Sequence, residues 1–232
     1  MTPVHNGRPV SPTKHSTCVA EKALGTTYGV AKEARLIPVL LGFVSGSSIT
    51  QGFKQVIDDL TKDKEDAEKE NREPTRYAKS VLIISAATKQ TFDKLPLDRR
   101  PYTLLREYLS KLTTMGLPIV AAAGNRADAS TGDVEVKQLP AWYASGQLFP
   151  IIDVGAAGPE GNIISTSRRG DKVSIYADGK DIQCSAQVQS GTSFTAAQVG
   201  GGIAVAMSQT EGPFYEATQD MRLHCARHLP VP

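Results

Sequence analysis

The sequence predicts an α/β fold with a mainly parallel sheet and helices on both of its faces. Short apolar runs at 80–85, 117–123 and 150–156 have the length and composition of buried strands. They alternate along the chain with segments of helical periodicity, which implies right-handed crossovers between parallel strands. A chain of 232 residues fits one sizeable domain, 1–232, and no repeat or second domain is evident.

The N-terminal region is expected to begin as a loop at 2–14 and to continue as a helix at 16–24, where apolar residues fall on one face. Gly25 ends that helix, since glycine is favoured where helices terminate. The apolar run 35–41 predicts a strand, although Pro38 lacks the backbone donor that a sheet ladder uses.

Three further helices are expected in the middle and C-terminal parts of the chain. Apolar residues at helical spacing predict helices at 49–70 and 101–115, and a stretch of small apolar residues predicts another at 198–207. The charge run at 61–72 predicts a solvated helix end or loop. The tail, 209–232, is expected to form a helix on the surface.

Composition excludes several functional classes. The net charge is +2, and no basic stripe alternates with aromatic residues, which argues against nucleic acid as a partner. No apolar run approaches the roughly 20 residues of a membrane helix. Residues 1–12 do not form a signal peptide, and the sequence assigns no compartment. The three cysteines, Cys18, Cys184 and Cys225, show no metal-binding spacing and are expected to be small buried thiols, because one disulfide would leave one cysteine over.

The most informative motif is Gly-Thr-Ser at 191–193, which runs directly into the apolar stretch 198–207. A helix that opens on a serine presents the hydroxyl beside free backbone N–H groups. Nucleophilic catalysis needs both features, an exposed hydroxyl and donors for the developing oxyanion. Taken alone, the motif is better explained as an ordinary helix N-cap.

Two other segments add to this motif. His15 opens an apolar helical stretch, and the buried run 117–123 ends in Gly124-Asn125. In the order His15, Asn125, Ser193, these segments resemble the subtilisin-like serine peptidases, or subtilases. In that family the histidine begins a helix, the asparagine closes an Ala-Ala-Gly-Asn strand end, and the serine lies in Gly-Thr-Ser-Met-Ala. Residues 151–156 also resemble the family's Val-x-x-Val-Gly-Ala strand.

The resemblance covers about 14–208 and implies a three-layer subtilisin-like fold and hydrolysis of peptide bonds without a cofactor. Members of the family often bind calcium, but the sequence shows no Asp-x-Asp-type loop, so no metal ligand is assigned. Ser193 would be the nucleophile and His15 the general base, while the Asn125 side chain and the Ser193 N–H would hold the oxyanion. In subtilisin, loss of that asparagine donor slows the reaction by about 10²–10³. The structural alternatives are a surface histidine at a helix start and a turn asparagine after Gly124.

The resemblance also implies two walls of a cleft for a polypeptide, against which the substrate backbone pairs as an added strand. One wall comprises Ser85, Ala86 and Ala87, and the other comprises Ala122, Ala123 and Gly124. Ala87 stands where the family has glycine, and its methyl group is expected to narrow or block the cleft. The structural alternative is a well-packed strand end.

The third catalytic residue of the family has no visible counterpart. The family order is Asp, His, Ser, and the aspartate belongs to a first strand upstream of the histidine. Fourteen residues precede His15, and none is Asp or Glu. The first acid, Glu21, lies inside the helix and is not expected to reach the imidazole. The sheet is therefore expected to lack the strand of the catalytic aspartate.

Two hypotheses stay open. The chain is a subtilisin-like serine endopeptidase, truncated or slow, or it is a catalytically silent module that binds an extended peptide or partner chain in the former cleft. In subtilisin, removal of the aspartate alone slows turnover about 3 × 10⁴-fold and leaves residual catalysis. Ser16, Asp178 and Ala197 also depart from the family motifs, which indicates relaxed constraint.

Overall fold

The computed structural model describes residues 4–5, 8–9, 13–41, 44–77, 79–89, 100–144, 149–185 and 187–209. The helix expected within 209–232 lies outside these residues, as does Cys225. None of the helices in the described ranges is long and apolar enough to cross a membrane.

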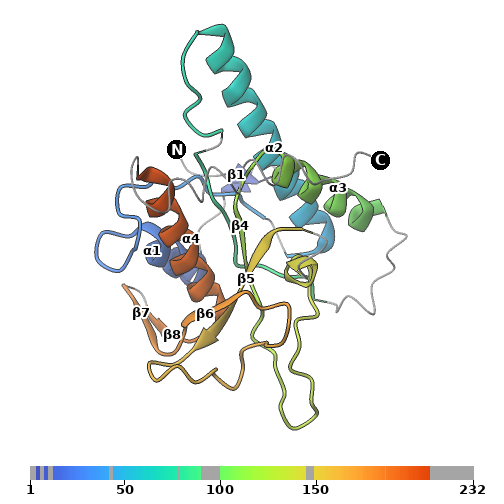
Figure 1. Ribbon diagram of the computed structural model, residues 1–232, viewed down its shortest axis with the longest axis vertical. Helices are drawn as coiled ribbons and strands as arrows, with labels where there is room; N and C mark the ends of the chain where they lie inside the picture. The colour runs from blue at the N-terminus through green and yellow to red at the C-terminus, as the bar shows by residue number, and fades with distance from the viewer. Residues whose placement is uncertain are drawn as a thin grey trace.

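A parallel sheet of four strands forms the centre of the protein (Figure 1). Its strands, in spatial order, are β3 (Leu82–Ile84), β4 (Ile119–Ala122), β5 (Ile151–Ala157) and β6 (Ile175–Asp178). The three expected strands at 80–85, 117–123 and 150–156 are thereby confirmed. Because every neighbouring pair is parallel, the carboxyl ends of all four strands lie at one edge of the sheet.

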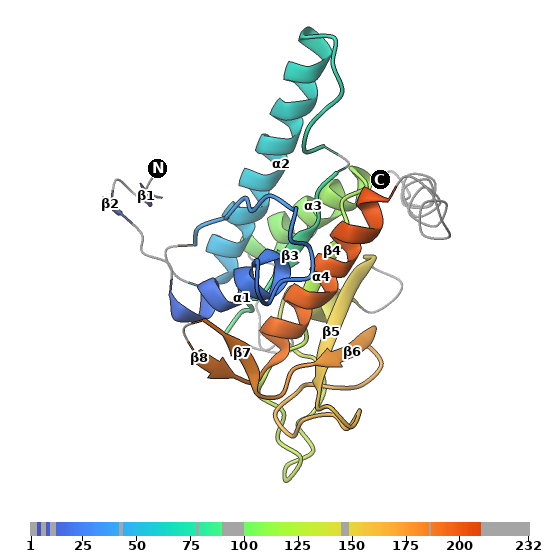
Figure 2. The same ribbon diagram turned by 90° about the vertical axis from the view of Figure 1, so that its left-hand side faces the viewer.

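Helices cover both faces of this sheet (Figures 1 and 2). On one face lie α2 (Gly46–Lys69) and α3 (Arg100–Thr114), and on the other lie α1 (Lys14–Leu24) and α4 (Thr192–Ser208). This arrangement confirms the three-layer α/β prediction and the four helices expected in this part of the chain.

The alternation of side chains along β4 divides the core into two halves. Ile119 and Ala121 belong to the cluster on the α2 and α3 face, where Leu109 is fully buried. Val120 points to the opposite face and packs with Ala196 of α4. This period of two follows from the pleat of a strand, and burial on both faces explains why the whole run is apolar.

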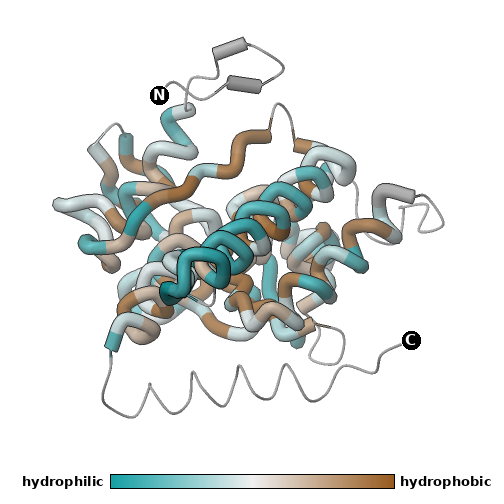
Figure 3. Tube along the Cα trace, turned by 90° about the horizontal axis from the view of Figure 1, so that it is seen from above, coloured by the Kyte–Doolittle hydropathy of each residue, from teal (hydrophilic) through white to brown (hydrophobic). Residues whose placement is uncertain are grey.

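Helix α2 begins earlier than expected because Ser45 and Ser48 form a reciprocal capping box. Its C-terminal half projects beyond the rest of the protein and is strongly hydrophilic (Figures 1 and 3). The charge run was expected to be solvated, and Lys62 and Asp66 do form an exposed ion pair. Asp63, however, is buried.

Hydrogen bonds to Asp63 hold the segment after α2 against this helix. Its carboxylate accepts hydrogen bonds from Thr75 Oγ1 at 2.7 Å, from the Arg76 N–H at 2.7 Å and from the Tyr77 N–H at 3.0 Å. Burial alone raises the pKa of Asp63, but the hydrogen bonds from Tyr77, Arg76 and Thr75 outweigh it and hold the pKa well below its usual range. Asp63 is therefore a structural carboxylate within a surface charge run.

Two predictions near the N-terminus are wrong. Residues 35–41 form no strand, because no described strand pairs with them; Val39 and Leu41 instead lie against Gly52 of α2. Within the expected loop, β1 (Val4–His5) and β2 (Arg8–Pro9) pair as a two-stranded antiparallel unit. The first error arises because a strand needs a partner that local composition cannot supply. The second concerns a pairing between residues only a few positions apart, which the sequence analysis did not identify.

A second antiparallel pair, β7 (Ile182–Cys184) and β8 (Gln187–Gln189), precedes α4. The sequence analysis did not identify it. The chain leaves β8 and enters α4 within a few residues, so this hairpin positions the beginning of the helix.

One buried carboxylate has no partner. Asp153 lies in β5 opposite Ala121 of β4 and has no exposed surface. Among the described residues, neither of its carboxylate oxygens has a hydrogen-bond partner. Burial raises the pKa of Asp153 to about 8, and the nearby backbone N–H of Val154 offsets this only in part.

Candidate active site at the ends of β3, β4 and α4

The residues with expected catalytic roles come together where the helices α1 and α4 begin. His15 is the second residue of α1, and Ser193 is the second residue of α4. The His15 ring packs against the ring of Phe194, the residue after Ser193, with 5.6 Å between centroids. Two residues that are 179 apart in sequence, 15 and 194, are thus neighbours at this site.

His15 begins α1 because Thr13 caps the helix, its hydroxyl accepting a hydrogen bond from the Ser16 N–H at 3.1 Å. His15 is exposed as a residue, but its imidazole is partly covered by protein, including the Phe194 ring. This partial burial lowers the pKa of His15 below its ordinary value of 6.5. The neutral imidazole, which can accept a proton, is therefore the favoured form at neutral pH.

No carboxylate within the described part of the chain forms a hydrogen bond or ion pair with His15. The expectation for Glu21 is confirmed: its Oε2 accepts a hydrogen bond from the Ser185 N–H at 2.8 Å, so it is engaged away from the imidazole. Glu21 instead helps to hold α1 against β7.

The turn that leads into Ser193 requires glycine two positions earlier. Gly191, the N-cap of α4, has a φ of +152°, and a Cβ there would lie 2.9 Å from the Asn125 Nδ2. Ser193 is mostly buried, and its carbonyl accepts a hydrogen bond from the Ser85 hydroxyl at 3.0 Å. Ser85, at the end of β3, thereby joins one expected wall of the cleft to the serine.

The Asn125 side chain is held in one orientation. Its Oδ1 accepts hydrogen bonds from the Thr192 N–H at 2.8 Å and from the Thr192 hydroxyl at 3.0 Å. The same hydroxyl accepts a hydrogen bond from the Gly124 N–H at 3.1 Å. Because Oδ1 takes both bonds, Nδ2 is the donor end of the amide, and both ends lie close to Gly191 in the loop before Ser193.

The two expected walls of the cleft follow neighbouring strands. Residues 85–87 continue from β3 and are half-buried, while residues 122–124 end β4. Gly124 has a φ of +107°, a conformation that glycine adopts readily, and the chain turns there toward Asn125. The structure therefore places both segments at the same sheet edge as Ser193.

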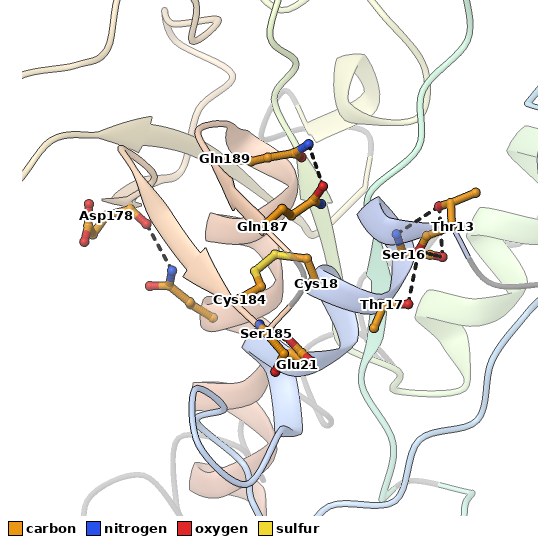
Figure 4. Close-up of a disulfide and its surroundings, with 11 residues drawn as sticks. Thr13, Ser16, Thr17, Cys18, Glu21, Asp178, Cys184, Ser185, Gln187 and Gln189 are labelled. Carbon is orange, nitrogen blue, oxygen red and sulfur yellow. Dashed lines mark hydrogen bonds between the residues drawn. A yellow bond between two sulfur atoms is a disulfide. The ribbon is translucent and has the colours of Figure 1, made fainter.

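A disulfide joins Cys18 of α1 to Cys184 of β7, with 5.4 Å between their Cα atoms (Figure 4). The prediction of free thiols is therefore wrong for these two residues, although both are buried as expected. They pack with Phe194 in one apolar cluster. The sequence could not pair them, because their proximity depends on how α1 docks against the hairpin.

Comparison with known proteins extends the likeness to nearly the whole chain. The model of the subtilase family matches residues 3–228. The chain belongs to the subtilase family. Among its relatives is subtilisin-like protease 2 of Trichophyton rubrum, 29% identical over 201 residues, which are 84% of this chain and 41% of that protein. The protein of the same name from Trichophyton verrucosum is 29% identical over 88% of this chain and 44% of its own length.

Solved structures show the same fold. A cold-adapted subtilisin-like serine proteinase superimposes with a TM-score of 0.63 at 23% identity, over 90% of this chain and 67% of that chain. A lanthipeptide protease superimposes with a TM-score of 0.60 at 16% identity, over 94% and 69%. This subtilase chain spans less than half the length of the curated relatives that it matches.

The sequence analysis missed two residues that hold this site together. Thr192 orients Asn125, and Arg168 is buried with its backbone N–H donating to the Gly124 carbonyl at 2.9 Å. The Arg168 guanidinium donates to Asp133 Oδ1 at 2.7 Å, and with Lys137 it holds the pKa of Asp133 well below its usual range. The position of Thr192 inside Gly-Thr-Ser was a usable signal, whereas nothing local marks Arg168.

Proposed function

We propose that this subtilase chain is a serine endopeptidase in which Ser193 is the nucleophile, His15 the general base and Asn125 an oxyanion donor. The orientation of Asn125 is the observation that supports this most directly. Two hydrogen bonds from Thr192, the residue before Ser193, hold Oδ1 and leave Nδ2 as the end of the amide that can donate to an oxyanion. Preorganised donors of this kind stabilise the charge that develops during acyl transfer.

In the proposed reaction, the Ser193 Oγ attacks the carbonyl carbon of the substrate while His15 takes the hydroxyl proton. The carbonyl oxygen becomes an oxyanion, which accepts hydrogen bonds from Asn125 Nδ2 and the Ser193 N–H. When the peptide C–N bond breaks, the imidazolium returns the proton to the leaving amine. Water, deprotonated by the same histidine, then hydrolyses the acyl-enzyme and releases Ser193.

The electrostatics of the site are consistent with a slow version of this reaction. The lowered pKa of His15 keeps the imidazole neutral and able to act as a base. In the described residues nothing accepts a hydrogen bond from it, so neither its tautomer nor the imidazolium is stabilised. The corresponding loss in subtilisin, about 3 × 10⁴-fold, sets the scale expected for turnover by this chain.

A silent peptide-binding module is the second candidate. Among the described residues, no hydrogen bond joins Ser193 Oγ to His15, and no carboxylate contacts His15. The two walls at 85–87 and 122–124 would serve equally well to bind an extended peptide by strand addition. In this second candidate function, the chain binds a peptide in the cleft but does not hydrolyse it.

A fluorophosphonate probe separates the two candidates. Its phosphorus forms a bond with an activated serine oxygen and releases fluoride, so labelling reports the nucleophile without requiring turnover. On protein shown to be folded by circular dichroism, we expect label on Ser193 by peptide mapping. We expect none in Ser193→Ala and slower labelling in His15→Ala. Folded protein that stays unlabelled, or label on another residue, would refute the peptidase proposal and favour the binding module.

A further inference from the structure

Phe194 connects the candidate nucleophile to the candidate base through packing. It directly follows Ser193 in α4, and its ring lies against the His15 imidazole with 5.6 Å between ring centroids and 54° between ring planes. Both values are typical of aromatic rings in favourable contact. Among the described residues, the imidazole forms no hydrogen bond with a protein group, so packing against neighbours such as this ring has to set its orientation.

The Phe194 ring is held in place by its surroundings. Phe194 is 2% exposed and packs in one apolar cluster with Cys18, Ile182 and Cys184. The disulfide between the two cysteines joins α1, which carries His15, to β7, which leads into α4 (Figure 4). The ring therefore lies in the cluster that fastens the helix of the base to the hairpin before the nucleophile.

The backbone that carries the ring is held as well. The Phe194 N–H donates to the Gly191 carbonyl at 3.3 Å. The Ser193 carbonyl, which belongs to the same peptide unit as that N–H, accepts a hydrogen bond from the Ser85 hydroxyl at 3.0 Å. The imidazole of His15 thus contacts a ring whose position is fixed relative to the nucleophile.

We propose that Phe194 is a positioning residue for His15, whose imidazole it holds in the orientation that can take the proton of Ser193. The inference rests on the proposed function. In the Ser-His-Asp triad a carboxylate orients the imidazole and also stabilises the imidazolium. An apolar ring can restrict the rotation of the imidazole, but it cannot stabilise the positive charge.

The surroundings of His15 allow its titration to report the contact with Phe194. The segments packed against α1, namely α4 and the β7–β8 hairpin, contain no ionisable side chain besides the disulfide-bonded Cys184. Burial lowers the pKa of His15 because it disfavours the imidazolium. Removing the ring uncovers the imidazole, so the pKa should rise toward 6.5. The other ionisable residues of α1 are Lys14, Glu21 and Lys22.

Two measurements on Phe194→Ala test the inference. The first is the pKa of His15 by NMR titration, with its signal among the four histidines assigned by its loss in His15→Gln. The second is the rate of fluorophosphonate labelling of Ser193 between about pH 5 and about pH 9, the range in which histidine titrates. We expect the pKa and the midpoint of the labelling profile to rise together.

The rate on the plateau above that midpoint is the decisive quantity, because the imidazole is neutral there in both proteins. We expect the plateau rate of Phe194→Ala to be lower by at least about tenfold, since a displacement of about 1 Å can cost about 10²-fold in rate. A change in the pKa alone would leave this plateau unchanged. The plateau therefore reports the orientation of the base and not its protonation.

Phe53→Ala is the matched control, because Phe53 is also buried, at 4% exposed, but belongs to the cluster beside α2 and α3. It should lower the free energy of unfolding and leave both the pKa of His15 and the labelling rate of the folded protein unchanged. Phe194→Leu and Phe53→Leu keep most of the apolar volume. They repeat the comparison if an alanine variant does not fold, and the same directions are expected.

A plateau rate in folded Phe194→Ala or Phe194→Leu equal to that of the wild type would overturn the inference while the peptidase proposal stands. Equal slowing by the Phe53 variants would also overturn it, because the loss would then follow from a weakened core. If the wild type itself does not label on Ser193, the proposed function fails and the inference fails with it.

Discussion

Replacing Asp153 with asparagine should make the protein more stable at pH 8 and change its stability little at pH 4. Asp153 is fully buried in β5, and both of its oxygens lack partners among the described residues. Burial disfavours the carboxylate and raises its pKa to about 8. The folded protein therefore carries the protonated acid at neutral pH, whereas the unfolded chain carries the carboxylate.

The magnitude follows from the proton balance. Between the ordinary pKa of 3.8 and the folded pKa of about 8, the folded state binds a proton that the unfolded state has released. The free energy of unfolding therefore falls as pH rises through this interval, by up to about 1.4 kcal/mol per pH unit. Over the whole interval the free energy of unfolding falls by about 5–6 kcal/mol, and the fall is complete above about pH 8.

Urea unfolding of the wild type and of Asp153→Asn at pH 4, 6 and 8, followed by circular dichroism, measures this loss. The asparagine is nearly isosteric and does not titrate, so the difference between the two proteins should grow steadily with pH. Asp58→Asn is the control, because Asp58 is exposed and forms an ion pair with Lys54 on the surface of α2. It should show no growing difference.

A difference between wild type and Asp153→Asn that is constant from pH 4 to pH 8 would refute the reasoning. It would mean that the carboxyl group finds a partner or water on ionisation and that its burial imposes no penalty. A difference that grows in the opposite direction would show that the folded protein stabilises the carboxylate.

Three further outcomes are expected. Cys184→Ser should lower the free energy of unfolding by about 2–5 kcal/mol in urea, because the bond to Cys18 closes a loop across a sequence separation of 166 residues; a reductant should weaken the wild type alone. Thr192→Val should slow fluorophosphonate labelling of the nucleophile about tenfold, because the hydroxyl that orients the oxyanion donor is lost. Asp63→Ala should lower the melting temperature by removing the buried acceptor of three hydrogen bonds, at about 2–3 kcal/mol, whereas Asp66→Ala on the same helix should have a much smaller effect.

Most of the fold could be predicted from local sequence patterns. The apolar runs of β3, β4 and β5 and the periodicity of the helices depend only on neighbouring residues, and these elements were predicted within a few positions. The run 35–41 has equally apolar composition but no partner strand, and composition cannot supply a partner. For the same reason, local composition could not predict the disulfide between Cys18 and Cys184.

The residues of the candidate site likewise fall into those that local sequence predicts and those that it does not. Asn125 and Ser193 lie in short motifs that can be recognised in the sequence, and His15 is recognisable at the start of its helix. Gln138 and Arg168 come from two different loops without periodicity, and only the folded chain brings them to Gly124. Asp153 carried a signal that went unused, since a single acid inside the apolar run 150–156 is unusual for a buried strand.

The disulfide between Cys18 and Cys184 also determines what a single backbone cut does to this chain. Any cleavage between these residues, for instance in the exposed turn at 129–132, leaves both pieces covalently joined. A nicked molecule would migrate as one band on a non-reducing gel and as two after reduction. For a protein of a peptidase family, self-inflicted nicks would therefore remain invisible until the thiols are freed.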